Sequence, residues 1–228
     1  MKKIAIGLIF LLVCSVAAFS QSNNRTISVS GSGSVKVPAD TARLTFSVIT
    51  KEATALNSVQ NNAVRMNKVY DALKNAGIPD TSISTSNYSL YQESVYKDGK
   101  REPGLYVTSN NIVVILDDVE KSGFVIDTAI SAGVNRMNGI SFFVKDSNAA
   151  LNEARVLAFK QAKEKAELYA KEAGCKLGRV LSISENDNVS FATRETMDAK
   201  MYLSENSTTI QAGEDKIIAS VFVVFELK

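Results

Sequence analysis

Residues 148–173, NAALNEARVLAFKQAKEKAELYAKEA, form the most regular stretch of this sequence, and they decide its fold class. A stripe of mostly alanine residues recurs there near the helical period. The stripe consists of Leu151, Ala154, Ala158, Ala162, Ala166, Tyr169 and Ala173. The other face carries lysine–glutamate pairs four residues apart, as a solvated helix surface does. We therefore predict a long helix that lies close against a sheet.

Strands are predicted before and after this helix in the sequence. In each of these segments, apolar and polar residues alternate, or a run of apolar residues lies between turn signals. The predicted strands are residues 26–37, 41–51, 83–96, 105–116, 134–144, 177–185 and 217–227. The first two are expected to form an antiparallel hairpin at the N-terminus. Gly31 and Gly33 interrupt the first strand and indicate a bulge or a close backbone approach. The nearly unbroken apolar run of the last strand suits a central position in its sheet.

Two further helices are predicted, a long one over residues 53–76 and a short one over residues 119–132. Gly77 and Gly133 follow them as C-terminal caps. The sequence therefore predicts an α+β fold of mostly antiparallel sheets, with two long helices and one short helix packed on them.

The N-terminal segment, residues 1–20, has the pattern of a secretory signal peptide, with Lys2 and Lys3 ahead of an apolar run and small residues before Gln21. Cys14 offers a lipid anchor as the alternative, but Val13 before it disfavours that alternative. Residues 21–228 would form a single domain, and no later segment approaches transmembrane length. We expect a periplasmic or cell-surface protein.

A long polar segment, residues 186–215, separates the last two predicted strands. Loops of this length are usually functional or disordered. The segment holds apolar side chains that would be costly to leave in water: Phe191, Met197, Met201, Tyr202 and Leu203. We predict an irregular arm that packs on a neighbouring subunit through these residues. A partly disordered connection is the alternative.

Few residues in the chain could carry catalysis. There is no histidine, the commonest general base and metal ligand, and Cys175 is the one cysteine outside residues 1–20. The candidates for a carboxylate activity are two acidic clusters, Asp117-Asp118-Glu120 and Glu214-Asp215, although acidic residues are ordinary beside turns and Asp118 also suits a helix N-cap. Removing Lys2 and Lys3 leaves 24 basic against 24 acidic residues, so nothing favours a nucleic-acid partner. We expect no enzyme, no cofactor and no metal.

Three stretches together resemble the SIMPL-domain family of bacterial secreted proteins: residues 27–43, residues 153–178 and residues 212–227. The resemblance implies a periplasmic or envelope protein of the oxidative-stress defence or immunogenic type, and some members of the family are thought to assemble into large rings. It supplies no catalytic residues. The favoured hypothesis is thus a non-enzymatic envelope protein that acts as a homo-oligomer. The alternative is a monomeric binding module for a small ligand or envelope partner, with the tyrosine-rich hairpin at residues 83–106 as its site.

Overall fold

The computed structural model describes residues 25–185, 191–192 and 210–228. The chain divides into two compact units, each built from segments that are distant in the sequence. The first unit takes the chain up to Gly33, Arg155–Asn188 and Ala219–Lys228. The second unit takes Ser34–Ala154 and Val189–Ile218. Each unit has its own core of buried apolar side chains.

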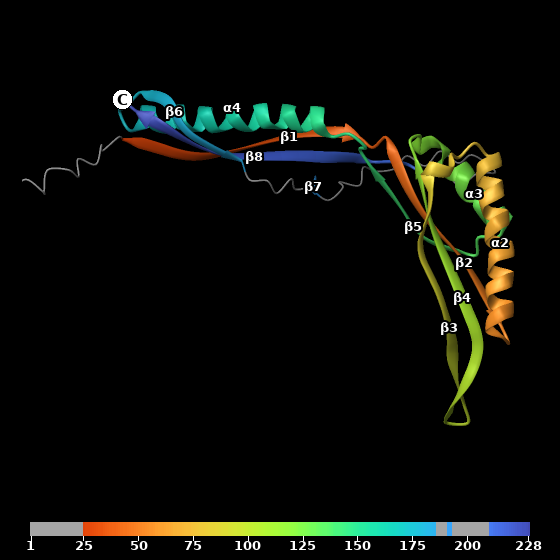
Figure 1. The fold of residues 1–228 in the computed structure, drawn as a ribbon. Helices are drawn as coiled ribbons and strands as arrows, with labels where there is room; N and C mark the ends of the chain where they lie inside the picture. The colour runs from red at the N-terminus through yellow and green to blue at the C-terminus, as the bar shows by residue number, and fades with distance from the viewer. Residues whose placement is uncertain (1–24, 186–190, 193–209) are drawn as a thin grey trace, which may run out of the picture. The chain divides into compact units, whose positions relative to one another are not determined.

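In the first unit, a long helix lies along a sheet (Figure 1). The strands stand in the order β1 (Thr26–Pro38), β8 (Glu214–Leu227) and β6 (Leu177–Glu185). Both pairings are antiparallel, since β6 is antiparallel to β8 and the Leu227 N–H donates to the Arg25 carbonyl at the start of β1. The C-terminal strand is therefore central, which confirms that prediction.

The helix α4 (Asn148–Glu172) packs on this sheet through alanine. Its buried residues are Ala154, Ala158, Ala162, Ala166 and Ala170. The predicted stripe is correct in its middle and wrong at its end, because Tyr169 is 56% exposed and Ala170 takes its place. A repeat of four residues, rather than a strict 3.6-residue period, follows the sheet along the helix. The Lys163–Glu167 pair lies on the solvated face, as predicted.

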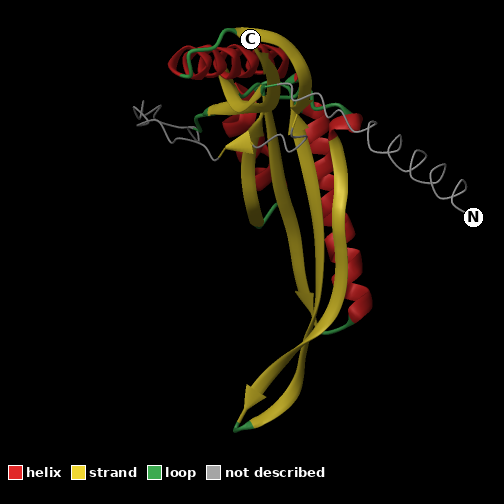
Figure 2. Cartoon of the chain, turned by 90° about the vertical axis from the view of Figure 1, so that its left-hand side faces the viewer, coloured by secondary structure: helices red, strands yellow, loops and turns green. Residues whose placement is uncertain are grey.

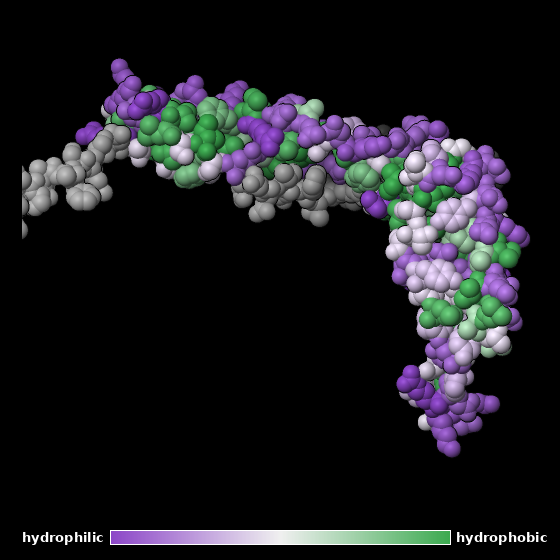
Figure 3. Space-filling model, in the orientation of Figure 1, coloured by the Kyte–Doolittle hydropathy of each residue, from purple (hydrophilic) through white to green (hydrophobic). Residues whose placement is uncertain are grey.

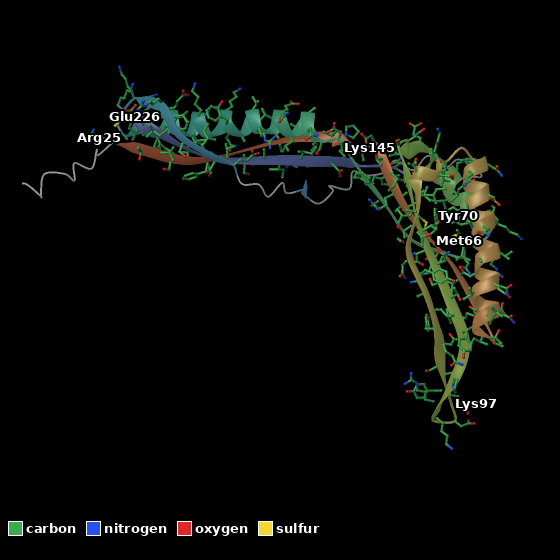
Figure 4. All side chains as sticks on the ribbon, in the orientation of Figure 1. Arg25, Met66, Tyr70, Lys97, Lys145 and Glu226 are labelled. Atoms are coloured by element: carbon green, nitrogen blue, oxygen red, sulfur yellow. The ribbon has the colours of Figure 1, made fainter. Side chains whose placement is uncertain are left out.

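The second unit contains the four-stranded antiparallel sheet β3-β4-β2-β5. Its strands are β2 (Thr41–Glu52), β3 (Ile83–Lys97), β4 (Lys100–Leu116) and β5 (Arg136–Phe143). Helices α2 (Ala55–Asn75) and α3 (Ser122–Ala132) pack with the sheet into one core, which includes Phe46. Met66 of α2 belongs to the same core and is labelled in Figure 4. The short 3-10 helices η1 (Asp80–Ser82) and η2 (Val119–Lys121) connect the elements. The predicted α+β class, with two long helices and one short one, is confirmed.

The predicted N-terminal hairpin is wrong, because β1 pairs with β8 while β2 lies between β4 and β5. A tight hairpin needs residues with positive φ in its turn, such as Asn-Gly. Ala39 and Asp40, which connect the two strands, do not supply them. Distant residues hold this connection instead: the Ala39 N–H donates to the Gly213 carbonyl, and Asp40 Oδ1 accepts from the Lys145 N–H.

The hairpin β3–β4 forms as the sequence predicts. Asp98 and Gly99 have φ values of 51° and 76°, the positive values that a two-residue type I′ turn requires. Past Glu52, where β2 ends, β3 and β4 continue alone as a two-stranded ribbon (Figure 2). The apolar residues at the end of β4 follow one another without alternation, a pattern that predicts burial on both faces, but only one face is fully buried. Ile112, Val114 and Leu116 are buried, but the residues between them are half-buried.

The predicted arm falls largely outside the described residues. Within it, Phe191–Ala192 forms β7 and pairs antiparallel with Ile217 and Lys216 of β8. Ile210 and Ala212 pack against the core of the second unit. No helix in the described ranges is long and apolar enough to cross a bilayer.

Candidate interaction surfaces

Asp117 and Asp118, two of the candidate acidic residues, have structural partners. Asp117 forms an ion pair with Lys145 Nζ at 2.8 Å. Asp118 caps η2, as predicted, by accepting from the Glu120 N–H. Among the residues that the structure describes, no three potential metal-ligating side chains of His, Cys, Asp or Glu gather into a group.

Asp40 is the carboxylate with the clearest electrostatic perturbation. The Lys145 backbone N–H donates to Asp40 Oδ1 at 2.9 Å, and the Thr41 hydroxyl donates to the same oxygen at 2.7 Å. These two hydrogen bonds, the first above all, lower the pKa of the Asp40 carboxyl below its ordinary value of 3.8. The residue lies at the junction between β1 and β2, so its charge stabilises a turn.

Cys175 is half-buried just after the end of α4. Its backbone N–H donates to the Ala170 carbonyl at 2.8 Å, in the pattern of a helix C-terminal cap after Gly174. Gly174 has a φ of 68°, which that cap requires. This geometry gives the position a structural role.

The β3–β4 hairpin presents the largest group of exposed apolar and aromatic side chains in the second unit. Its members are Tyr88, Leu90, Tyr91, Val95, Tyr96 and Leu105, each at least 41% exposed. Figure 3 shows pale and hydrophobic atoms over this hairpin above a hydrophilic tip. Large apolar groups clustered on a surface mark interaction sites, whereas single ones are ordinary.

β3 also forms one edge of its sheet, and we call the outer edge of Ile83–Gln92 the β3 edge. None of these ten residues is charged, and none is proline or glycine. Edge strands of monomeric proteins are usually protected by charges, prolines, bulges or a covering segment. The register with β4 shifts between Thr85 and Asn87 and again between Gln92 and Ser94, so Asn87–Gln92 is regular.

Other edges are protected within each unit. On β1, Gln161 Oε1 of α4 accepts from the Ser32 N–H at 2.9 Å, and Lys165 Nζ donates to the Ser30 carbonyl at 3.0 Å. On β2, beyond the end of β5, the Asn135 side chain binds both the N–H and the carbonyl of Ile49.

The two remaining edge strands are interrupted. β6 carries Arg179 and Glu185, and its register with β8 shifts twice. β5 is eight residues long and its register with β2 shifts near Thr45. An equally long uncharged stretch, Thr26–Val35 of β1, contains two glycines, and side chains of α4 contact its backbone. The β3 edge differs from it, because it has no glycine and no such contact on its backbone among the described residues.

The five residues predicted for self-association are only partly located. Phe191 lies in β7, and the other four, Met197, Met201, Tyr202 and Leu203, lie outside the described residues. The sequence reasoning missed the β3 edge. The sequence does contain a signal, ten consecutive residues without charge. The same run in a central strand would not indicate an interaction site, and the sheet order is what shows that β3 is an edge strand.

Comparison with known proteins finds one matching family and several bacterial relatives. The SIMPL family, described as a protein of unknown function (DUF541), matches residues 27–225. The 26 kDa periplasmic immunogenic protein of Brucella melitensis biotype 1 is 33% identical over 228 residues, covering 94% of this chain and 91% of that protein. The uncharacterized protein YggE of Edwardsiella ictaluri is 29% identical over 173 residues, covering 75% of this chain and 72% of that protein. The uncharacterized protein YggE of Escherichia coli K12 is 27% identical over 157 residues, covering 69% of this chain and 64% of that protein.

Proposed function

The chain belongs to the SIMPL family, and from this premise we propose that it is a non-enzymatic protein of the bacterial envelope that acts by self-association. One observation carries the proposal: the β3–β4 hairpin exposes six large apolar or aromatic side chains on and beside an uncharged sheet edge. A partner that covers them would remove apolar area from water at about 25 cal/mol per Å². A ring-shaped oligomer and a role in oxidative-stress tolerance are the finer parts of the proposal, and the family resemblance supports them.

The arm is the second contact surface that we propose. Phe191, Met197, Met201, Tyr202 and Leu203 supply apolar groups between β6 and β8, and β7 attaches their start to β8. Two separate contact surfaces on one chain allow an assembly larger than a dimer.

Native mass tests this proposal. Residues 21–228 are purified, and their mass is measured by size-exclusion chromatography with light scattering over a wide concentration range. We expect a defined multiple of the monomer mass. A variant without residues 193–209 keeps β7 and the Ala39–Gly213 hydrogen bond, and it should have fewer subunits per assembly. A monomer at high protein concentration would contradict self-association.

Export to the envelope is part of the same proposal. Two of the matched relatives are named as periplasmic proteins. We propose that residues 1–20 are removed and that the protein begins at Gln21 in the periplasm or at the cell surface. Mass spectrometry of the protein from an envelope fraction tests this. A fatty-acid adduct on Cys14 would show a lipid anchor instead.

The second candidate function is a monomeric binding module that uses the same hairpin. A shallow hollow of about 250 Å³ lies beside its ribbon, lined by Gln92, Glu93, Ser94, Arg101, Glu102 and Pro103. These residues are mostly polar and charged, so they would suit a small polar ligand. A thermal-shift screen against envelope metabolites separates the two functions, because a ligand of the folded state raises Tm in a monomeric sample.

A further inference from the structure

We infer that the β3 edge pairs antiparallel with the β3 edge of a second copy of this chain, which joins two four-stranded sheets into one of eight strands. This inference rests on the proposed self-association and names its interface. It does not involve the arm, so the two contact surfaces can be tested separately.

The β3 edge has the properties of a pairing site. Its backbone N–H and carbonyl groups have no strand partner among the described residues, since β3 is the first strand of its sheet. Ten uncharged residues offer no repulsion to an incoming strand. The regular part, Asn87–Gln92, has about the length of an average strand, and β-strand addition uses such edges.

Symmetry restricts the register. Two identical antiparallel edges are related by a two-fold axis perpendicular to the sheet, so both copies present the same face to the same side. Residues that lie opposite each other must then have side chains on the same side of the sheet. The axis must therefore pass midway between one residue and the same residue of the second copy. We assign that residue as Ser89, because this register sets Tyr88 of each copy opposite Leu90 of the other.

The exposed side chains favour this register. Tyr88 and Leu90 are 49% and 43% exposed, and they lie on the same face as α2, where Tyr70 Oη reaches Thr85 Oγ1 at 3.2 Å. Aromatic and aliphatic side chains placed directly opposite each other stabilise antiparallel pairs. On the other face, Tyr91 comes opposite Asn87 of the second copy.

Charge explains why a second copy fits. In this register, the part Asn87–Tyr91 of the regular segment pairs only with itself, and it contains no charged residue. The basic residues of the hairpin tip, Lys97, Lys100 and Arg101, lie beyond the paired segment. The strand is thus compatible with itself without any substitution.

Charges introduced at the symmetry axis test the inference. Ser89→Lys puts two lysines opposite each other at the axis, and Ser89→Asp puts two aspartates there. We expect each variant alone to lose at least half of the native mass of the natural protein. An equimolar mixture of the two variants should regain that mass, because lysine of one copy then faces aspartate of the other.

Two controls accompany these variants. Ser141→Lys adds the same charge on β5, the opposite edge of the same sheet, and should leave the native mass unchanged. Tyr91→Lys replaces an exposed side chain beside the axis, and it should lower the mass even if the Ser89 variants fold poorly. Circular dichroism and Tm establish which variants are folded.

The outcomes separate the two proposals. If the natural protein is oligomeric but folded Ser89→Lys and Tyr91→Lys variants keep its mass, the β3 pairing is wrong and self-association stands. If the two Ser89 variants are folded and separated but their mixture does not regain the mass, the assigned register is wrong. A monomeric natural protein overturns both proposals.

Discussion

Gly31 of β1 lies directly against Ala158 of α4. A Cβ atom added to Gly31 would be 2.0 Å from the Ala158 carbonyl oxygen and 2.7 Å from the Ala162 nitrogen. The helix backbone therefore rests on the strand backbone, with alanine on one side and glycine on the other. Of the two explanations that the sequence allowed for this glycine, the close backbone approach is the one that the structure shows.

Gly31→Ala should destabilise the first unit strongly. The added methyl group meets helix backbone that cannot move without shifting α4, so we expect a loss of about 3 kcal/mol, the upper part of the range for overpacked cores, or failure to fold. Gly213→Ala is the matched control, since nothing lies within 4 Å of its added Cβ. Urea unfolding measures both variants. A Gly31→Ala protein as stable as the control would contradict the close packing of α4.

The two phenylalanines of β8 should differ sharply, although they are three residues apart. Phe225 is 2% exposed and lies 6.4 Å from the Phe159 ring, whereas Phe222 is 48% exposed on the face away from α4. We expect Phe225→Ala to cost about 3–5 kcal/mol, as buried phenylalanines do. Phe222→Ala should cost less than about 1 kcal/mol. Denaturant titration compares them, and equal losses would show that the open face of the sheet is covered in solution.

Gln161 should protect the free edge of β1. Gln161→Ala removes the acceptor of the Ser32 N–H, a hydrogen bond worth about 0.5–1.5 kcal/mol. Hydrogen exchange of the Ser32 amide should therefore be roughly 2- to 12-fold faster, with Lys160→Ala as the control. Unchanged exchange would mean that another group covers the edge. The Gln161→Ala variant should also aggregate more readily, because an exposed strand edge can pair with another chain.

The charge of Asp40 should make the β1–β2 connection sensitive to acid. Because its pKa is lower in the folded state, the carboxylate stabilises the fold at pH values above the ordinary value of 3.8, and this contribution is lost as the pH falls below it. Asp40→Asn keeps an acceptor oxygen but does not ionise. We expect the variant to have a lower Tm than the natural protein at pH 6, and the gap to narrow by pH 3. A constant gap across this range would contradict the assignment.

Local patterns predicted the elements of the fold well. The helix at residues 148–173, the Asp98–Gly99 turn and the capping of η2 by Asp118 follow from spacing, turn chemistry and side-chain hydrogen bonds within a few residues. Such properties are decided by neighbours in the chain, so the sequence is sufficient to predict them. Tertiary packing then decided one detail that the pattern missed: Ala170 is buried against the sheet, and the predicted Tyr169 is exposed.

By itself, the sequence of this protein determined an α+β chain with an alanine-faced helix, a central last strand and a scarcity of catalytic groups. The tertiary structure alone decided that β1 joins β8 instead of β2, and that the uncharged residues 83–92 form an edge. Strand pairing depends on contacts between residues from opposite ends of the chain, such as Arg25 and Leu227, and no local pattern encodes which strand will be the neighbour. For the same reason, the candidate interface became visible only in the folded sheet.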